Sequence, residues 1–224
     1  MPSAEASQVF PLYVYDEDGG NRRDNVTDWA LQKFRAAYGA GVTKRAIFDY
    51  VYAVPAPPDV RERYKDNLKR ELPRIPLAAD AATFRRWADI GGQLAALHLG
   101  YESAAEYPLE YRENRNVPFT WRVTKMRLTP DRSAVVVNEA LTLAGIPSDA
   151  YDYRLGNRSA LEWVIDQYQV TRDRRSGLVS DPNRDDDPQY IARLIGRVIT
   201  VSLATQRLVA ALAADGWPVG AAVE

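Results

Sequence analysis

The stretch YDYRLGNRSALEWVIDQYQV, residues 151–170, contains the signals on which our interpretation of this chain is centred. It opens with the aromatic-rich run YDYRL, residues 151–155, which favours a short strand. Gly156-Asn157 is a turn signal that ends this strand. Ser159, followed three residues later by Glu162, forms a capping box, which marks the start of a helix. The stretch therefore predicts a strand, a tight corner and a capped helix.

The corner between the strand and the helix gathers polar side chains. Arg154, Asn157 and Arg158 lie within five residues of one another. One interpretation is a turn with solvated arginines, which is common on protein surfaces. The other is a loop that contacts a phosphate or the edge of a base. The residues of the corner alone leave both interpretations open.

The composition sets broad limits on the rest of the chain. With 224 residues, 46% of them apolar and 26% charged, the chain can bury a sizeable core. The net charge of −1 predicts that any binding of anions depends on a local patch. There is no cysteine, no signal-peptide pattern at the start and no run of about 18 apolar residues. We therefore expect a cytoplasmic protein that does not span a membrane.

The first hundred residues are expected to be mainly helical. Thr27 and Asp80 are good N-caps for helices that end near Tyr38 and Leu99, and a helix between them is expected from near Thr43 to Pro55. On the second of these helices, Val51 and Tyr52 are expected to face the core together with Ile47 and Phe48. Residues 59–71 predict one charged helix with a solvated face. His98, the only histidine, is interpreted as a packed side chain.

After residue 100 the pattern changes from helical to strand-like. Residues 121–128 alternate and are followed by a turn at 129–132 and a second strand at 133–138, which predicts a β-hairpin. In such a strand Val123, Lys125 and Arg127 share one face. Residues 171–187 predict a long polar loop, and a buried helix is expected from Asp187 to about Ala213.

These elements predict an α+β fold with a helical N-terminal half, a β-hairpin-containing recognition half and a long buried C-terminal helix. We expect a single domain over residues 8–213, with tails at 1–7 and 214–224. Within it, residues 8–100 form a helical support, 101–186 a β-rich recognition part and 187–213 the buried helix.

Motifs for catalysis are missing from the sequence. There is no Gly-rich phosphate loop that ends in Gly-Lys-Ser/Thr, no G-x-S-x-G motif and no pair of histidines. Asp181, Asn183 and Asp185 are spaced like the start of a calcium loop. The required glycine is absent, however, and Ala192 stands where a bidentate acid is needed. We interpret this segment as an acidic loop that caps a helix, and we expect neither a metal site nor a catalytic centre.

Several segments together resemble a known family. They are LYVYDEDGGNRRDNVT (12–27), IFDYVYAV (47–54), YKDNLKRELPRIPL (64–77), GGQLAALHLGYE (91–102), SALEWVIDQYQV (159–170) and DPQYIARLIGRVITVS (188–203). Across nearly the whole chain they look like the C-terminal target-recognition domain of Type ISP restriction–modification enzymes. A departure is Pro55-Ala-Pro-Pro58, where the family more often carries a Leu-His-Ser-Pro-like linker.

The resemblance implies sequence-specific recognition of double-stranded DNA for an adenine-N6 methyltransferase and restriction enzyme. It implies no catalysis and no cofactor in this chain, with S-adenosylmethionine, ATP and Mg²⁺ used by other domains of a parent enzyme. The implied partners are double-stranded DNA and methyltransferase and helicase-like domains, in cis or in trans. An alternative is a protein-interaction module that docks onto those domains without reading bases, an idea that the near-zero net charge favours.

The candidate DNA-binding residues are chosen by position and chemistry. Arginine suits guanine and phosphate, and asparagine suits adenine. The candidates lie on the hairpin, at the corner and in the long loop: Lys125, Arg127, Arg132, Arg154, Asn157, Arg158, Arg172, Arg174 and Arg175.

Overall fold

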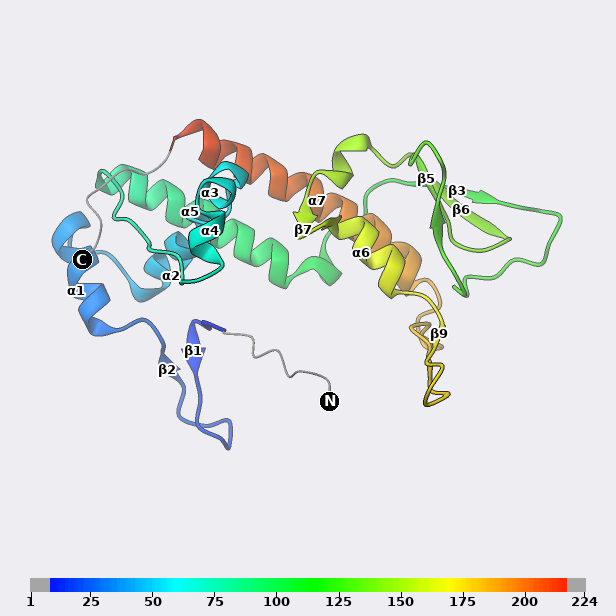
Figure 1. The fold of residues 1–224 in the computed structure, drawn as a ribbon, viewed down its shortest axis with the longest axis horizontal. Helices are drawn as coiled ribbons and strands as arrows, with labels where there is room; N and C mark the ends of the chain where they lie inside the picture. Colours follow the sequence, from blue (N-terminus) through cyan, green and yellow to red (C-terminus); the bar gives the residue numbers. More distant parts are fainter. Residues whose placement is uncertain (1–8, 217–224) are drawn as a thin grey trace. The chain divides into compact units, whose positions relative to one another are not determined.

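The computed structural model describes residues 9–216, and it contains helices together with small antiparallel sheets (Figure 1). This confirms the predicted α+β class. The described chain divides into two compact units. Unit 1 holds the residues up to Ala95 and from Leu208 onward, and unit 2 holds Ala96–Arg207. The predicted single domain stays a prediction. Of the predicted tails at 1–7 and 214–224, residues 1–7 and 217–224 lie outside the described residues, and Ala214 is the last residue of the C-terminal helix.

Unit 1 is almost entirely helical. Its elements are β1 (Tyr13–Val14), β2 (Arg23–Asp24), α1 (Asp28–Tyr38), α2 (Lys44–Ala53), α3 (Pro58–Arg63), α4 (Lys65–Leu68), most of α5 (Ala81–Leu99) and the last turns of α7 (Tyr190–Ala214). The hydroxyls of Thr27 and Thr43 accept from the amides of Ala30 and Ala46. Asp80 accepts from the amide of Thr83 at 2.8 Å. The predicted caps Thr27 and Asp80 are thus confirmed, and Thr43 is the N-cap of the helix that was expected to start near it.

Two predictions for unit 1 are wrong. The charged segment is two short helices that meet at Tyr64, whose φ of −107° and ψ of 12° are not helical. On α2, Val51 and Tyr52 are each 37% exposed, whereas Tyr50 and Ala53 are fully buried. The helix is turned so that the Tyr50 ring joins an aromatic core, and its hydroxyl donates to the carbonyl of Pro76 at 2.9 Å.

The core of unit 1 is built from packed rings and one close helix approach. The ring of Phe84 stacks on Tyr38 at 4.7 Å and contacts Tyr50 at 5.3 Å between centroids. Gly91 of α5 lies so near α2 that an added Cβ would be 1.9 Å from the carbonyl oxygen of Asp49. Only glycine permits this approach, because any side chain there would overlap the backbone.

Unit 2 combines a four-stranded sheet, small hairpins and two helices. Its elements are η1 (Tyr101–Ser103), β3 (Glu110–Glu113), β4 (Arg127–Leu128), β5 (Ala134–Val136), β6 (Leu141–Ala144), η2 (Ser148–Tyr151), β7 (Arg154–Leu155), β8 (Arg158–Ser159), α6 (Ala160–Gln167), β9 (Thr171–Arg172), β10 (Val179–Ser180) and most of α7. The sheet is antiparallel in the order β3-β6-β5-β4, and β7-β8 and β9-β10 are separate hairpins.

The core of unit 2 is mainly aliphatic. Leu143 of β6, Leu161 of α6 and Ile195 of α7 are fully buried in one cluster. By length and composition α7 is the one described helix that could cross a membrane, with a mean hydropathy of 1.3. A core helix passes the same test, and α7 supplies several of the fully buried side chains of this cluster.

His98 is packed, as predicted. Its imidazole stacks on the ring of Tyr153 at 5.4 Å between centroids, and its Nε2 lies 3.0 Å from the hydroxyl of Thr205. Burial lowers the pKa of His98, because the charged form loses solvation.

The hairpin predicted over residues 121–138 is shorter than expected. Only Arg127 and Leu128 pair with the second strand, opposite Val136 and Val135, and residues 121–126 follow an irregular path. The predicted shared face is wrong as well, since Val123 is fully buried while Lys125 and Arg127 are exposed. The alternating pattern requires an extended strand to place these three residues together, and the backbone is not one here.

Candidate nucleic-acid interface

All nine candidate residues lie in unit 2, and all are exposed. They occupy three features: the segment from Lys125 to the turn at Arg132, the β7–β8 corner, and the β9–β10 hairpin, which we call the arm (residues 171–180). The structure shows that these residues differ in whether their charges already have partners.

The corner is a tight hairpin that leads directly into α6. Arg154 pairs with Ser159 across β7 and β8, and Gly156 takes a φ of 69°. The guanidinium of Arg154 donates to the carbonyl of Asn157, and that of Arg158 forms an ion pair with Asp166 of α6. Both arginines therefore stabilise the corner itself. The predicted strand from Tyr151 is correspondingly short, because Tyr151 ends the 3₁₀ helix η2.

The capping box at the start of α6 is present as predicted. The Ser159 hydroxyl accepts from the amide of Glu162 at 3.1 Å, and the Glu162 carboxylate accepts from the amide of Ser159 at 2.9 Å. The backbone N–H of Ser159 is the main reason that the pKa of Glu162 lies below its ordinary value. The same carboxylate holds Arg132, which joins the corner to the hairpin turn.

Arg132 is held by several contacts at the end of its turn. Its guanidinium is 2.8 Å from the carboxylate of Glu162 and 4.1 Å from the ring centroid of Tyr151. The Tyr151 hydroxyl donates to the carbonyl of Arg132 at 2.8 Å, and burial raises the pKa of Tyr151 to about 12. Arg132 has a φ of 60°, a strained conformation that these contacts maintain.

The turn before Arg132 is closed by Asp131. Its carboxylate accepts from the Ser133 hydroxyl at 2.7 Å and from the Ser133 amide at 3.2 Å. Hydrogen bonds from Thr129 and Ser133 lower the pKa of Asp131 to about 2. The turn therefore keeps its negative charge over the whole physiological range of pH.

Lys125 lines an open groove of about 360 Å³ between residues 125–128 and α6. Arg158 of the corner lines the same groove, so the structure brings these two candidates together. Glu162 and Asp166 also line it. Within residues 9–216, the side chains of Lys125 and Arg127 form no ion pair.

The arm is the most exposed of the three features. Every residue from Thr171 to Ser180 is exposed, and Figure 1 shows the hairpin that begins at β9 extending from unit 2 beyond the end of α6. Its tip is shaped by Asp173, whose carboxylate accepts from the amides of Arg175 and Ser176. In the described part of the chain, the side chains of Arg172, Arg174 and Arg175 form no ion pair.

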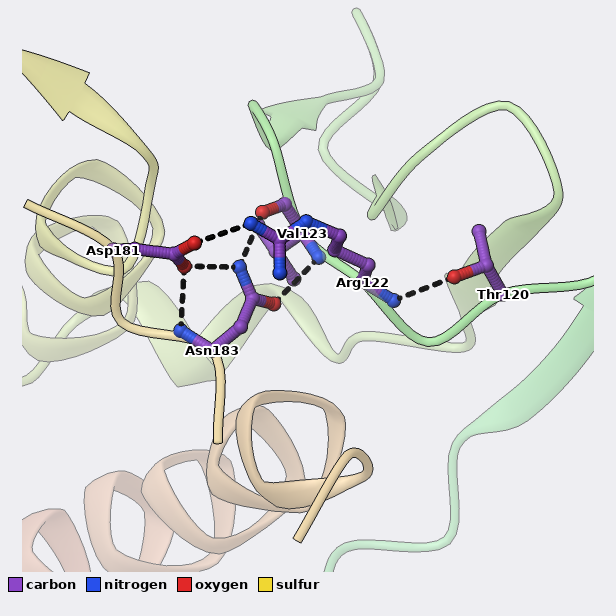
Figure 2. Close-up of polar contacts among 5 residues, drawn as sticks. All are labelled: Thr120, Arg122, Val123, Asp181 and Asn183. Carbon is purple, nitrogen blue, oxygen red and sulfur yellow. Dashed lines mark hydrogen bonds and ion pairs between the residues drawn. The ribbon is translucent and has the colours of Figure 1, made fainter. Parts of the chain in front are cut away.

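Two residues at the base of the arm were not among the candidates. The side-chain oxygen of Asn183 accepts from the backbone N–H of Val123, and its side-chain nitrogen donates to the carbonyl of Val123, each at 2.8 Å (Figure 2). Asp181 forms an ion pair with Arg122 and accepts from Asn183. The pKa of Asp181 is lowered chiefly by the hydrogen bond from the Asn183 side chain.

The calcium-like spacing of Asp181, Asn183 and Asp185 is the only local sequence pattern that includes these two residues. Among residues 9–216, no group of three or more His, Cys, Asp or Glu side chains is arranged to hold a metal ion. The two side chains at the base of the arm instead bind the 122–123 segment, 60 residues away along the chain for Asn183 and Val123. A partner at that distance leaves no pattern in the local sequence.

Three solved structures resemble this chain closely. A nuclease-deletion mutant of the Type ISP restriction-modification enzyme LlaGI, in complex with a DNA substrate mimic, is 34% identical over 90% of this chain, with a TM-score of 0.72. The ATP-dependent Type ISP enzyme LlaBIII bound to DNA is 30% identical over 88%, with a TM-score of 0.74. DrdV in a DNA complex is 36% identical over 90%, with a TM-score of 0.75.

This chain corresponds to only a small part of those proteins. It covers 14% of the LlaGI chain, 13% of the LlaBIII chain and 21% of the DrdV chain. A search of curated proteins found no match. The family described as the Type ISP C-terminal specificity domain matches residues 1–194, which is most of the sequence. The chain therefore belongs to the Type ISP C-terminal specificity domain family.

Proposed function

We propose that this chain recognises a specific sequence in double-stranded DNA on behalf of an adenine-N6 methyltransferase and restriction enzyme. Membership of a specificity-domain family supports this function. The three similar structures are of enzymes in complex with DNA or a DNA mimic, and the similarity extends over 88–90% of this chain.

The observation that carries the proposal is the group of exposed cations without ion pairs in unit 2. Arg172, Arg174 and Arg175 lie on a protruding two-stranded arm, and Lys125 and Arg127 lie on the segment to which its base is bonded. A two-stranded ribbon fits the major groove, where arginine can donate two hydrogen bonds to guanine. Cations that have no protein partner are available to phosphates without breaking an existing pair.

The remaining candidates take a different role in this proposal. Arg132, Arg154 and Arg158 already bind groups of the protein, so we assign them to holding the turn and the corner in shape. Asn157 is exposed at the tip of the corner. An asparagine side chain can bond to both N6 and N7 of adenine, which makes Asn157 a candidate base reader.

Chemistry is assigned to other domains of the parent enzyme. In this proposal the chain is non-catalytic, and S-adenosylmethionine, ATP and Mg²⁺ are used by methyltransferase and helicase-like domains joined to it or bound to it. Methylation of the exocyclic nitrogen of adenine requires the base to leave the duplex, and a recognition domain contributes by placing the correct site at the methyltransferase.

The proposal is tested by electrophoretic shift of the purified chain on a pool of random duplexes, followed by sequencing of the bound fraction. We expect enrichment of one motif. If the five unpaired cations contact phosphates, log K should fall with log[salt] with a slope of about −4.5. A shift that does not respond to salt, or a bound pool without any motif, would contradict the proposal.

A protein-docking function is the second candidate, and exposed apolar side chains favour it. Leu155 of β7 is 48% exposed and Trp163 of α6 is 46% exposed. Aromatic and aliphatic side chains of this kind are frequent in protein interfaces. If the chain does not shift any duplex at low salt but binds a purified methyltransferase domain of the family, this second function is the correct one.

A further inference from the structure

Residues just before and just after the arm form hydrogen bonds to the rest of unit 2. The residues that they contact, Thr124 and Val123, are neighbours in the sequence. Before the arm, the amide of Val170 donates to the carbonyl of Thr124 at 3.1 Å. After the arm, Asn183 makes its two hydrogen bonds to the backbone of Val123 (Figure 2). The pair of bonds from Asn183 imitates one step of a β-ladder, with a side-chain amide in place of a strand.

The attachment point itself is fixed. Val123 is 0% exposed and packs in the core of unit 2. The segment that precedes it is also held, because the amide of Asn138 donates to the carbonyls of Thr120 and Arg122, each at 2.9 Å. A bond to Val123 therefore connects the arm to the core of unit 2 rather than to another exposed segment.

Asn183 is oriented by its own neighbour. Asp181 accepts from the backbone amide of Asn183 at 3.0 Å and from its side-chain amide at 2.6 Å, and it also pairs with Arg122. An acceptor and a donor are both needed at this position, because Val123 offers one N–H and one carbonyl. Asparagine satisfies both, whereas aspartate can satisfy only the first.

A second contact lies close to the same base. The guanidinium of Arg184 is 3.3 Å from the ring centroid of Tyr190, at the start of α7. The ring of Tyr168 lies 6.1 Å from that of Tyr190. The residues that flank the arm on both sides thus contact one buried tyrosine, whose hydroxyl donates to Glu102 at 2.8 Å.

We propose that Asn183, oriented by Asp181, is a positioning residue that sets the spacing between the arm and residues 125–127. The inference rests on the proposed DNA recognition. We call the two hydrogen bonds between Asn183 and the backbone of Val123 the clamp. With the clamp formed, the arginines of the arm and the cations at Lys125 and Arg127 meet DNA as one rigid surface. Reading bases requires this fixed geometry, whereas attraction to phosphates requires only charge. Loss of the clamp therefore lowers sequence preference and leaves non-specific affinity unchanged.

The test uses the whole chain with Asn183→Ala and with the milder Asp181→Asn, which leaves the bonds between Asn183 and Val123 in place. Asn67→Ala is the matched control, because Asn67 is exposed on α4 in unit 1 and its side chain forms no hydrogen bond within residues 9–216. Three quantities are measured: the ratio of affinity for the selected duplex to that for a scrambled one, the salt slope, and the rate of tryptic cleavage after Arg172, Arg174 and Arg175. Unfolding midpoints show which variants are folded.

We expect Asn183→Ala to lower the affinity ratio by about tenfold or more, with an unchanged affinity for the scrambled duplex. Cleavage of the arm should be faster. Asp181→Asn should lower the affinity ratio and raise the rate of cleavage by smaller amounts. If Asn183→Ala does not fold, Asp181→Asn is the variant that tests the inference. Asn67→Ala should behave like the wild type.

Two results would overturn the inference. One is an unchanged affinity ratio in a folded variant whose arm is cleaved faster, because a loosened arm would then read DNA as well as a fixed one. The other is an unchanged rate of cleavage in both variants, because this would show that the clamp does not restrain the arm. A wild-type chain that binds no duplex would instead refute the proposed function, so the two failures are distinguishable.

Discussion

The two units use their positive charges in different ways. In unit 1, several cations pair with acids three or four residues away: Arg45 with Asp49, Lys65 with Glu62, and Lys69 with Asp66. Two others, Lys44 and Arg86, pair with acids of other segments, Asp28 and Asp215. In unit 2, pairs such as Arg132–Glu162 connect separate elements. Unit 2 also leaves a group of exposed cations without ion pairs among the described residues, on the arm and at 125–127. Unit 1 has exposed cations without ion pairs among the described residues as well, such as Arg61 and Arg70, but these lie on or beside short helices, whereas those of unit 2 lie on a hairpin and at 125–127.

The two cores differ in a related way. Unit 1 packs aromatic rings between α1, α2 and α5, with Gly91 allowing two helices to approach closely. Unit 2 packs aliphatic side chains of a small sheet against α6 and α7, and its hairpins project beyond that core. We propose that unit 1 serves as the support and that unit 2 carries the DNA-reading surface, and the variants below test this division.

The largest effect on stability is expected in unit 1, from Gly91→Ala. The new Cβ would lie 1.9 Å from the Asp49 carbonyl oxygen, so α2 and α5 must move apart. We expect the free energy of unfolding to fall by about 3 kcal/mol. Denaturant unfolding measures this change, and the DNA motif of the folded fraction should be unaltered.

Gly92→Ala is the matched control for this variant. Its Cβ would meet the Asp49 carboxylate at 3.3 Å, and that flexible side chain can move aside. Alanine also favours helix over glycine by up to about 1 kcal/mol, so this variant should be at least as stable as the wild type. A change of DNA motif in a stably folded Gly91→Ala chain would contradict the assignment of unit 1 to support.

An intermediate effect is expected in unit 2, from Arg174→Ala and Arg175→Ala made singly. An arginine that reads a base should contribute about 1–3 kcal/mol on the preferred duplex only. One that holds a phosphate should weaken binding to all duplexes and reduce the salt slope by about 1. Titration of preferred and scrambled duplexes at several salt concentrations separates the two roles.

Arg70→Ala provides the comparison from unit 1. Arg70 is exposed beside α4, and its side chain forms no ion pair in the described part of the chain. Its removal should leave both affinities and the motif as they are. If Arg70→Ala abolished binding and both arm variants bound normally, the recognition surface would lie in unit 1.

The smallest effect is expected from Glu162→Gln, which tests whether the paired charges of unit 2 are structural. The pKa of Glu162 is lowered in the folded chain, so its ionised form stabilises the fold above its ordinary value of 4.5. That stabilisation is lost as the pH falls through the folded pKa. At pH 7 we expect the variant to be less stable by about 0.5–1 kcal/mol.

The difference in unfolding free energy between the wild type and Glu162→Gln should shrink as the pH is lowered below about 4.5, because protonation removes the same charge from the wild type. Chemical unfolding at pH 7, 5 and 3.5 measures it. Glu17→Gln, at an exposed residue of unit 1, should show no such trend. A difference that stayed constant with pH would show that the carboxylate charge does not stabilise the corner.

The sequence alone determined the features that depend on neighbouring residues. Thr27, Asp80 and Ser159 were identified as helix caps because the amides they bind are three residues away. The α+β class followed from the same local patterns. The family was also identifiable from sequence, because several segments of the chain resemble it together.

Tertiary structure decided which charges are free and where the arm is attached. Arg132 pairs with Glu162 over 30 residues, and Asn183 binds Val123 over 60 residues. The irregular path of residues 121–126 depends on the same contacts, so the alternating pattern predicted a strand that is not there. Such contacts form only when the core brings distant segments together, because their free energy depends on position in space rather than on spacing along the chain. The sequence therefore predicted cations that all lie in unit 2, and the fold separated those that pair within the protein from those that form no ion pair among residues 9–216.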